Sequence, residues 1–249
     1  ENEAYRVSAF ACGKNAPTDA EEAFTTEVNR EISGKLDFFA KLPIVEDMPK
    51  NISAIFGKSM SVLKSLAYSA DGSFNGMWCT PSRLNGEKMS PFCTAMCAYS
   101  MRCISPDLAK QCLMSALDLQ DENGFIPSSA TPDFKGENIE PPILAYQTLQ
   151  LFKSQGDISI LSESFEKLKK YLNYIIETRA CEDKMLFEWK IRISETENRC
   201  EESRMDSSPR FDGISKIYAI DFSCCMANEA KALSEIAEIL GKAGEHLYW

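Results

Sequence analysis

The sequence predicts an all-α protein whose paired helices form an incomplete α/α toroid. Apolar residues recur every three or four positions along most of the 249-residue chain, which is the period of an amphipathic helix. Three long connections separate the helices, and each contains aromatic residues, namely Trp78, Phe125 and Trp189. Long loops in compact helical domains are usually functional or disordered, and aromatic residues argue against disorder. We therefore expect helical hairpins with long loops on one side.

About seven helices are expected, each marked by an apolar stripe. The first carries the stripe from Phe24 to Phe39 after a capping box at Thr18, and the second begins at Asn51. A third carries Phe92, and a fourth starts at Ser105, an N-cap residue followed by proline. Almost no residues separate the third and fourth helices, so we expect an antiparallel hairpin. The others are expected at about 141–152, over 161–175 and over 222–240, where Gly241 ends the stripe.

Only a few short strands are expected. Residues 5–11 alternate between polar and apolar side chains, as a half-buried strand does. Residues 186–192 are a second candidate. We therefore interpret residues 1–15 as a tail or as the last strand of a preceding β domain, and residues 16–249 as a helical domain.

The composition argues against two classes of protein. The formal net charge is −10 and no stripe of Lys and Arg is present, whereas a nucleic-acid-binding surface needs clustered basic residues. No apolar run reaches the roughly eighteen residues that a transmembrane helix needs. We therefore expect neither nucleic acid nor a membrane as a partner.

The ten cysteines are expected to be free thiols. Several lie in apolar helical stretches, where Cys behaves as a small hydrophobic residue and indicates an intracellular protein. The Cys93, Cys97 and Cys103 spacings lack a matched second pair, and His246 is the one histidine of the sequence. No metal site and no cofactor are expected, and the expected location is cytoplasmic.

The segment from Glu202 to Asp212 carries the residues with the most chemical potential. Asp-Ser-Ser-Pro suits a turn, so the segment could be a solvated loop in which Asp206 or Asp212 caps a helix. It could instead hold a carboxyl group on a cleft loop, poised as a general acid near Arg210. The residues alone leave both interpretations open.

This segment resembles the Glu-Ser-Gly-x-Asp-x-Ser-Pro-Arg-(Phe/Trp)-Asp motif of (α/α)6-barrel glycoside hydrolases. The family includes mannosylglycerate and glucosylglycerate hydrolases and glycoside hydrolase family 63. Other blocks resemble the family in the same order, from residue 18 to the end: Trp78 to Arg83, Gly124 to Pro127 followed by Glu140 to Ala145, and Ala219 to Gly241. Four ordered blocks are a stronger signal than any single one.

The resemblance implies an inverting hydrolase that acts on an α-linked small glycoside or oligosaccharide. Asp206 matches the general acid, and the general base, a later Glu in relatives, is expected beyond this chain. In inverting enzymes the two carboxyl groups lie roughly 6.5–9.5 Å apart. Residues 16–249 would then be the N-terminal part of the catalytic domain, with about seven of the twelve helices of the full toroid. The sequence does not give the sugar, the aglycone or the oligomeric state.

Substrate contacts are expected from seven residues: Trp78, Phe92, Cys93, Glu140, Glu202, Arg210 and Asp212. Some of them depart from the family pattern, because Phe92-Cys93 stands for Trp-Asp and Glu140 for Gln. Arg204 also replaces a Gly. Trp78 and Phe92 are equally consistent with core aromatics, and Glu140 with a charge at a helix N-terminus. We expect Arg210 to pair with an acid other than Asp206.

These departures leave two alternatives to an active enzyme. One is an inactive carbohydrate-binding relative. The other is a helical scaffold for protein partners.

Overall fold

The computed structural model describes residues 8–11, 15–43, 46–82, 88–102, 104–183, 185–193 and 199–249. The chain divides into two compact units, Glu1–Pro49 and Lys50–Trp249. Most of the strand expected at residues 5–11, and residues 12–14 of the expected tail, lie outside the described residues. Residues 8–11 are described and do not form a strand.

The described residues of the first unit form two helices where one was expected, α1 (Ala16–Thr25) and α2 (Val28–Ala40). Thr26 and Glu27 adopt extended backbone between them, so the helix is interrupted although the apolar period continues. α1 starts at Ala16, before the expected capping box, because a proline fits the first helical turn. Neither helix has a buried residue, which leaves the whole stripe from Phe24 to Phe39 exposed.

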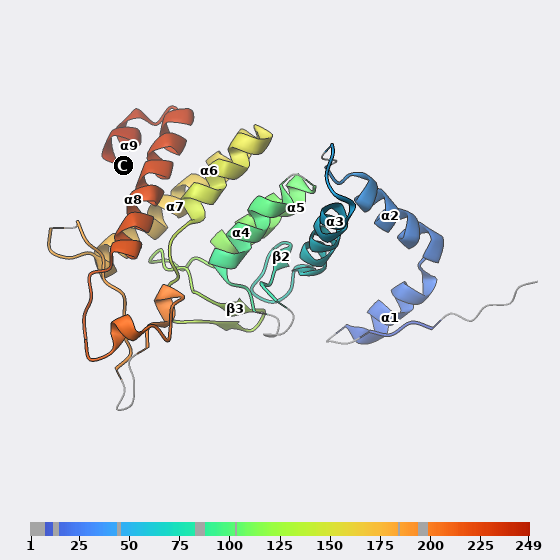
Figure 1. Cartoon of the computed structure of the whole chain (residues 1–249), viewed down its shortest axis with the longest axis horizontal. Coiled ribbons are helices and arrows are strands. Elements are labelled where there is room, and N and C mark those ends of the chain that lie inside the picture. The colour runs from blue at the N-terminus through green and yellow to red at the C-terminus, as the bar shows by residue number, and fades with distance from the viewer. Residues whose placement is uncertain are drawn as a thin grey trace, which may run out of the picture. The chain divides into compact units, whose positions relative to one another are not determined.

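The second unit contains all the other helices of the described chain (Figure 1). They are α3 (Lys50–Ser65), α4 (Pro91–Met101), α5 (Pro106–Leu117), α6 (Leu144–Gln155), α7 (Ile158–Arg179), α8 (Ile220–Ile239) and α9 (Ala243–Tyr248). α3 to α8 confirm the expected helices. α9 was not expected, because six residues are too few to show a stripe; it follows Gly241, whose φ of 71° ends α8.

The helices of this unit pack in pairs. α4 and α5 form the expected hairpin, and α6 contacts both α4 and α8. α7 packs against α5, α6 and α8. The even-numbered helices α4, α6 and α8 thus contact one another in turn, and α5 and α7 pack behind them. This arrangement is that of a partial α/α toroid and confirms the predicted fold class.

The described parts of the long connections contain four short strands. β1 (Ala67–Tyr68) pairs with β2 (Trp78–Cys79), and β3 (Ala130–Thr131) pairs with β4 (Phe134–Lys135), both antiparallel. The expected strand at 186–192 has only isolated bridges, at Phe187, Glu188 and Arg192. In Figure 1 the connections that carry β2, β3 and the segment between α7 and α8 lie on the same side of the helices.

Two apolar clusters hold this unit together. The larger joins α4 to α8 and includes Leu113, Phe165, Leu172 and Phe222, all at most 1% exposed. The smaller lies under the connections and includes Phe74, Trp78, Met89 and Leu119. Burial of large side chains beneath the loops gives those loops a rigid base.

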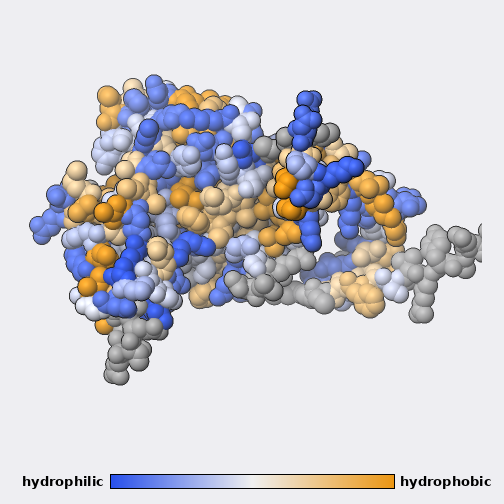
Figure 2. Space-filling model, in the orientation of Figure 1, coloured by the Kyte–Doolittle hydropathy of each residue, from blue (hydrophilic) through white to orange (hydrophobic). Residues whose placement is uncertain are grey.

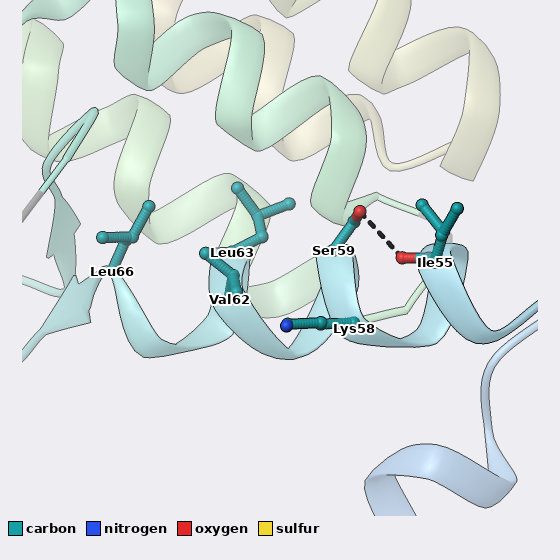
Figure 3. A pocket seen from close by; sticks show the side chains of 6 residues that line it. All are labelled: Ile55, Lys58, Ser59, Val62, Leu63 and Leu66. Carbon is teal, nitrogen blue, oxygen red and sulfur yellow. Dashed lines mark hydrogen bonds between the residues drawn. The ribbon is translucent and has the colours of Figure 1, made fainter.

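A third apolar surface lies along α3 and remains open to solvent. A hollow of about 360 Å³ is lined by Ile55, Lys58, Ser59, Val62, Leu63 and Leu66. Figure 3 shows these side chains along the helix, with the Ser59 hydroxyl donating to the Ile55 carbonyl, and apolar atoms reach the surface over α3 in Figure 2. The lining contains no carboxylate, and Lys58 is its one titratable side chain.

Within the described residues, no helix combines the length and the apolar character needed to cross a membrane.

Candidate active site

The loop between α7 and α8 holds Asp206 at an exposed turn. Two short 3-10 helices, η2 (Glu201–Ser203) and η3 (Pro209–Phe211), flank that turn. The side chains of Cys200 and Phe211 are fully buried and fix its two ends. The Cys200 N–H donates to the Asp206 carbonyl over 3.3 Å. Asp206 therefore sits at the tip of an anchored loop, beside a shallow hollow of about 500 Å³ that residues 204–208 line. We call residues 200–212 the acid loop.

Glu202 anchors this loop from below. Its side chain is 1% exposed and forms a two-point ion pair with Arg179, at 2.7 and 3.2 Å. The Lys190 N–H also donates to it, over 3.0 Å. Both oxygens are thus engaged below the surface, and the substrate contact expected of Glu202 is not compatible with this burial.

Arg210 anchors the other side of the loop. Its guanidinium lies 2.8 Å from the carboxylate of Asp221, so the expectation that Arg210 pairs with an acid other than Asp206 is confirmed. The Trp189 indole N–H also donates to Asp221 over 3.3 Å, and its ring stacks on Phe222 at 4.0 Å. Burial raises the pKa of Asp221, but the hydrogen bonds from Arg210 and Trp189 outweigh this and lower it below its ordinary value. Asp212 follows η3 and is exposed.

Glu140 caps α4, not the helix that it precedes in sequence. Its carboxylate accepts hydrogen bonds from the Ser90 hydroxyl at 2.8 and 2.9 Å and from the Phe92 N–H at 3.0 Å. Burial raises the pKa of Glu140, while the bonds from Phe92, Ser90 and Arg204 oppose that shift. Glu140 is therefore a charge at a helix N-terminus, as one interpretation of the sequence had it, but the helix is α4 and not α6.

Arg204 reaches from the acid loop to the same helix end. Its φ of 57° lies in the left-handed region. Glycine adopts this conformation readily, whereas other residues are strained there by roughly 1–2 kcal/mol. The guanidinium donates to Glu140 at 2.5 Å, to the Ser90 hydroxyl at 3.1 Å and to the Cys93 sulfur at 3.1 Å. It also lies 4.9 Å from the centre of the Phe92 ring, within cation–π range. We call Ser90, Phe92, Cys93, Glu140 and Arg204 the Arg204 cluster.

Trp78 lies away from this cluster, inside the core. The side chain is 1% exposed, and its ring stacks between Tyr68 at 4.9 Å and Phe74 at 4.3 Å. Its indole N–H donates to the Ser69 carbonyl. Both faces of the ring are covered, so the substrate contact expected of Trp78 is corrected to a core position.

The structure thus separates the expected site residues into groups. Phe92, Cys93 and Glu140 come together, and Arg204 joins them to the acid loop. The residues that sequence analysis missed are the partners: Ser90, Arg179 and Asp221. Ser90 carried a signal, because serine before Pro91 is a typical N-cap, and Asp221 lay in a matched block. Arg179 carried none, since it is one basic residue at the end of a long helix.

Glu229 is a further buried carboxylate that sequence analysis missed. It lies on α8, is fully buried, and accepts hydrogen bonds from the Ala145 and Tyr146 N–H groups, both at 2.8 Å. Burial raises the pKa of Glu229 to about 7, against the opposing backbone hydrogen bonds. Its position at the N-terminus of α6 makes it a structural cap.

Within the described residues, no cluster of three or more His, Cys, Asp or Glu side chains is arranged to hold a metal ion. Eight cysteines of the described chain are free thiols.

Comparison with solved structures supports the class of fold. The chain is similar to an uncharacterized conserved protein from Thermus thermophilus, with 14% identity and a TM-score of 0.61 over 74% of this chain and 57% of that one. It is equally similar to GH63 mannosylglycerate hydrolase from the same organism in complex with glucose, with 15% identity, a TM-score of 0.61 and the same coverage. A complex of that hydrolase with Tris and D-glycerate gives 16% identity and a TM-score of 0.51, over 73% of this chain and 50% of that one. At these identities the likeness defines the fold, a partial α/α toroid, and the chain spans 57%, 57% and 50% of the three relatives.

The match to a sequence family covers less of the chain than the match to solved structures. Residues 137–248 match the glycosyl hydrolase family 63 C-terminal domain, and this segment includes Glu140 and the whole acid loop. The resemblance to family 63 inferred from the motifs is thereby confirmed. No curated protein is significantly similar to the chain in sequence.

Proposed function

We propose that the chain supplies the acid-bearing half of an inverting glycoside hydrolase site, with Asp206 as the general acid. The observation that carries the proposal is the placement of Asp206 at the exposed tip of a loop anchored on both sides. Glu202 with Arg179 and Arg210 with Asp221 hold the two ends of that loop. A general acid has to be held at a fixed position while it gives its proton to the leaving oxygen.

Two aspects of the proposal extend beyond the described residues. The substrate is an α-linked small glycoside or oligosaccharide, in keeping with the glucose and D-glycerate bound by the mannosylglycerate hydrolase. The general base is a carboxylate outside this chain, which spans 57% of that hydrolase. The base would activate water on the face of the sugar opposite Asp206. The free thiols support a cytoplasmic location for the reaction.

The test is hydrolysis of α-mannosylglycerate by the full-length protein and by its Asp206→Asn variant. Loss of the proton donor should lower kcat by roughly 10²–10⁴-fold. Asp37→Asn makes the same chemical change at an exposed position of α2 and should leave kcat unaltered. Proton NMR of the first product formed should show the inverted anomer. An Asp206→Asn variant as active as the unchanged protein would refute the assignment.

A second candidate, an inactive carbohydrate-binding relative, is favoured by one observation. The Arg204 guanidinium contacts Glu140, Cys93 and Phe92. These are the residues expected to bind the sugar, and family members have glycine in place of Arg204. This candidate predicts that the protein binds the glycoside and releases no reducing sugar from it.

A further inference from the structure

We propose that Arg204 is an internal stand-in for the substrate and determines which glycosides the site admits. This inference rests on the proposed function, because it takes Phe92, Cys93 and Glu140 as the sugar-binding part of the site. The contacts of the Arg204 side chain are those that a pyranose would make.

The first similarity is between the guanidinium plane and the face of a sugar ring. The guanidinium carbon lies 4.9 Å from the centre of the Phe92 ring. A pyranose stacks its C–H face on an aromatic ring in the same manner, so Arg204 and the sugar compete for one surface. Phe92 is half-buried, and the guanidinium lies over it.

The second similarity is between the guanidinium N–H groups and sugar hydroxyls. Arg204 donates to one oxygen of Glu140 and to the Cys93 sulfur. The Glu140 carboxylate is otherwise occupied by Ser90 and by the Phe92 N–H. A carboxylate has about four lone-pair sites. Withdrawal of Arg204 would therefore leave one Glu140 oxygen with an unused lone pair, which a sugar hydroxyl can fill.

The arginine can leave its place, whereas Glu140 and Ser90 cannot. The Arg204 side chain is 37% exposed, against 8% for Glu140, and a long side chain can turn out to solvent without moving the backbone. Glu140 and Ser90 are buried and hold the end of α4. A glycoside thus enters only if its contacts replace both the ion pair and the ring contact of Arg204. Sugars without a hydroxyl group that reaches this Glu140 oxygen are excluded.

The experiment measures D-glucose binding to the full-length protein by isothermal titration calorimetry. Arg204→Gly relieves the left-handed strain and uncovers Phe92. The double variant Arg204→Gly with Glu140→Gln also removes the unpaired buried charge. Both variants should bind D-glucose about tenfold more tightly than the unchanged protein, a ratio that corresponds to about 1.4 kcal/mol. Arg102 lies over the Tyr99 ring at the other end of α4, so Arg102→Gly is the matched control and should leave the affinity unaltered.

The outcomes separate this inference from the proposed function. Equal affinities in the unchanged protein and in both variants overturn the role of Arg204 and leave the sugar site in place. The absence of D-glucose binding in all of them also overturns the role of Arg204, whereas the proposed function is overturned separately, by an Asp206→Asn variant that hydrolyses α-mannosylglycerate as fast as the unchanged protein. Thermal unfolding followed by circular dichroism verifies folding, and Arg204→Gln, which has a shorter and uncharged polar side chain, replaces any variant that fails to fold.

Discussion

Buried carboxylates at specific backbone sites organise the candidate site at the scale of single residues. As whole residues, Glu140, Glu202 and Glu229 are each at most 6% exposed, and each accepts hydrogen bonds from backbone N–H groups. A buried charge is tolerated when hydrogen bonds or an ion pair replace the lost water. These glutamates therefore act on the site by holding its backbone in place.

The ion pair between Glu202 and Arg179 should contribute strongly to stability. Arg179→Met would leave Glu202 buried without its counter-charge and should lower the free energy of unfolding by about 3–5 kcal/mol. Urea denaturation measures this change. The adjacent pair of Arg192 and Glu201 is 70% and 47% exposed, so Arg192→Met should cost less than about 1 kcal/mol. Equal effects of the two substitutions would contradict the buried, two-point geometry.

The helices were largely predictable at the scale of elements, and the site contacts were not. Stripes such as Leu161 to Ile175 repeat over many turns, so their period identifies a helix without knowledge of its neighbours. The break at Thr26 was missed because the apolar residues keep the same period across it. The role of Trp78 was ambiguous, because a tryptophan ring can stack on a sugar or pack in a core. Arg204 was recognised as a replacement of the family's Gly, but the direction of its side chain depends on Glu140 and other partners far away in the sequence.

Glycine positions test how closely the elements approach one another. Gly124 has a φ of 100°, and a Cβ there would lie 2.5 Å from the Lys170 carbonyl oxygen of α7. Gly124→Ala should therefore lower the free energy of unfolding by more than about 2 kcal/mol, since the backbone has to move.

Gly156 is the matched control for this prediction. It also has a positive φ, of 73°, but a Cβ there would meet nothing within 4 Å. Gly156→Ala should cost about 1 kcal/mol, the strain of the left-handed backbone alone. Urea denaturation compares the two variants, and equal losses would show that the contact with α7 is not tight.

At the scale of the whole molecule, stability should depend on pH through Glu229. Burial raises the pKa of this carboxyl from its ordinary value of 4.5 to about 7 in the folded state. Between these values the folded state binds more protons than the unfolded state, so stability falls as the pH rises. The loss attributable to this group should approach about 3 kcal/mol. Asp221, whose pKa is lowered, acts in the opposite sense at more acidic pH.

Unfolding in urea at about pH 5 and about pH 7.5 measures this dependence. Glu229→Gln should reduce the difference between the two pH values, whatever its effect on absolute stability. Glu238→Gln changes an exposed carboxyl on the same helix and should leave the difference unaltered. A pH dependence that survives Glu229→Gln in full would assign it to other groups.

Because distant glutamates cap two of the helices, the ends of these helices acquire their caps late during synthesis. α4 ends at Met101, but its N-terminus is satisfied by Glu140; α6 ends at Gln155 and is capped by Glu229. During synthesis each helix is therefore translated before its cap. Ser90 caps the Cys93 N–H of α4 from the start, but until Glu140 is present the Phe92 N–H depends on water, so the end of the candidate site at α4 becomes fully bonded only after the next connection has emerged. Arg204 is translated later still, so the Arg204 cluster is complete only after the acid loop has emerged.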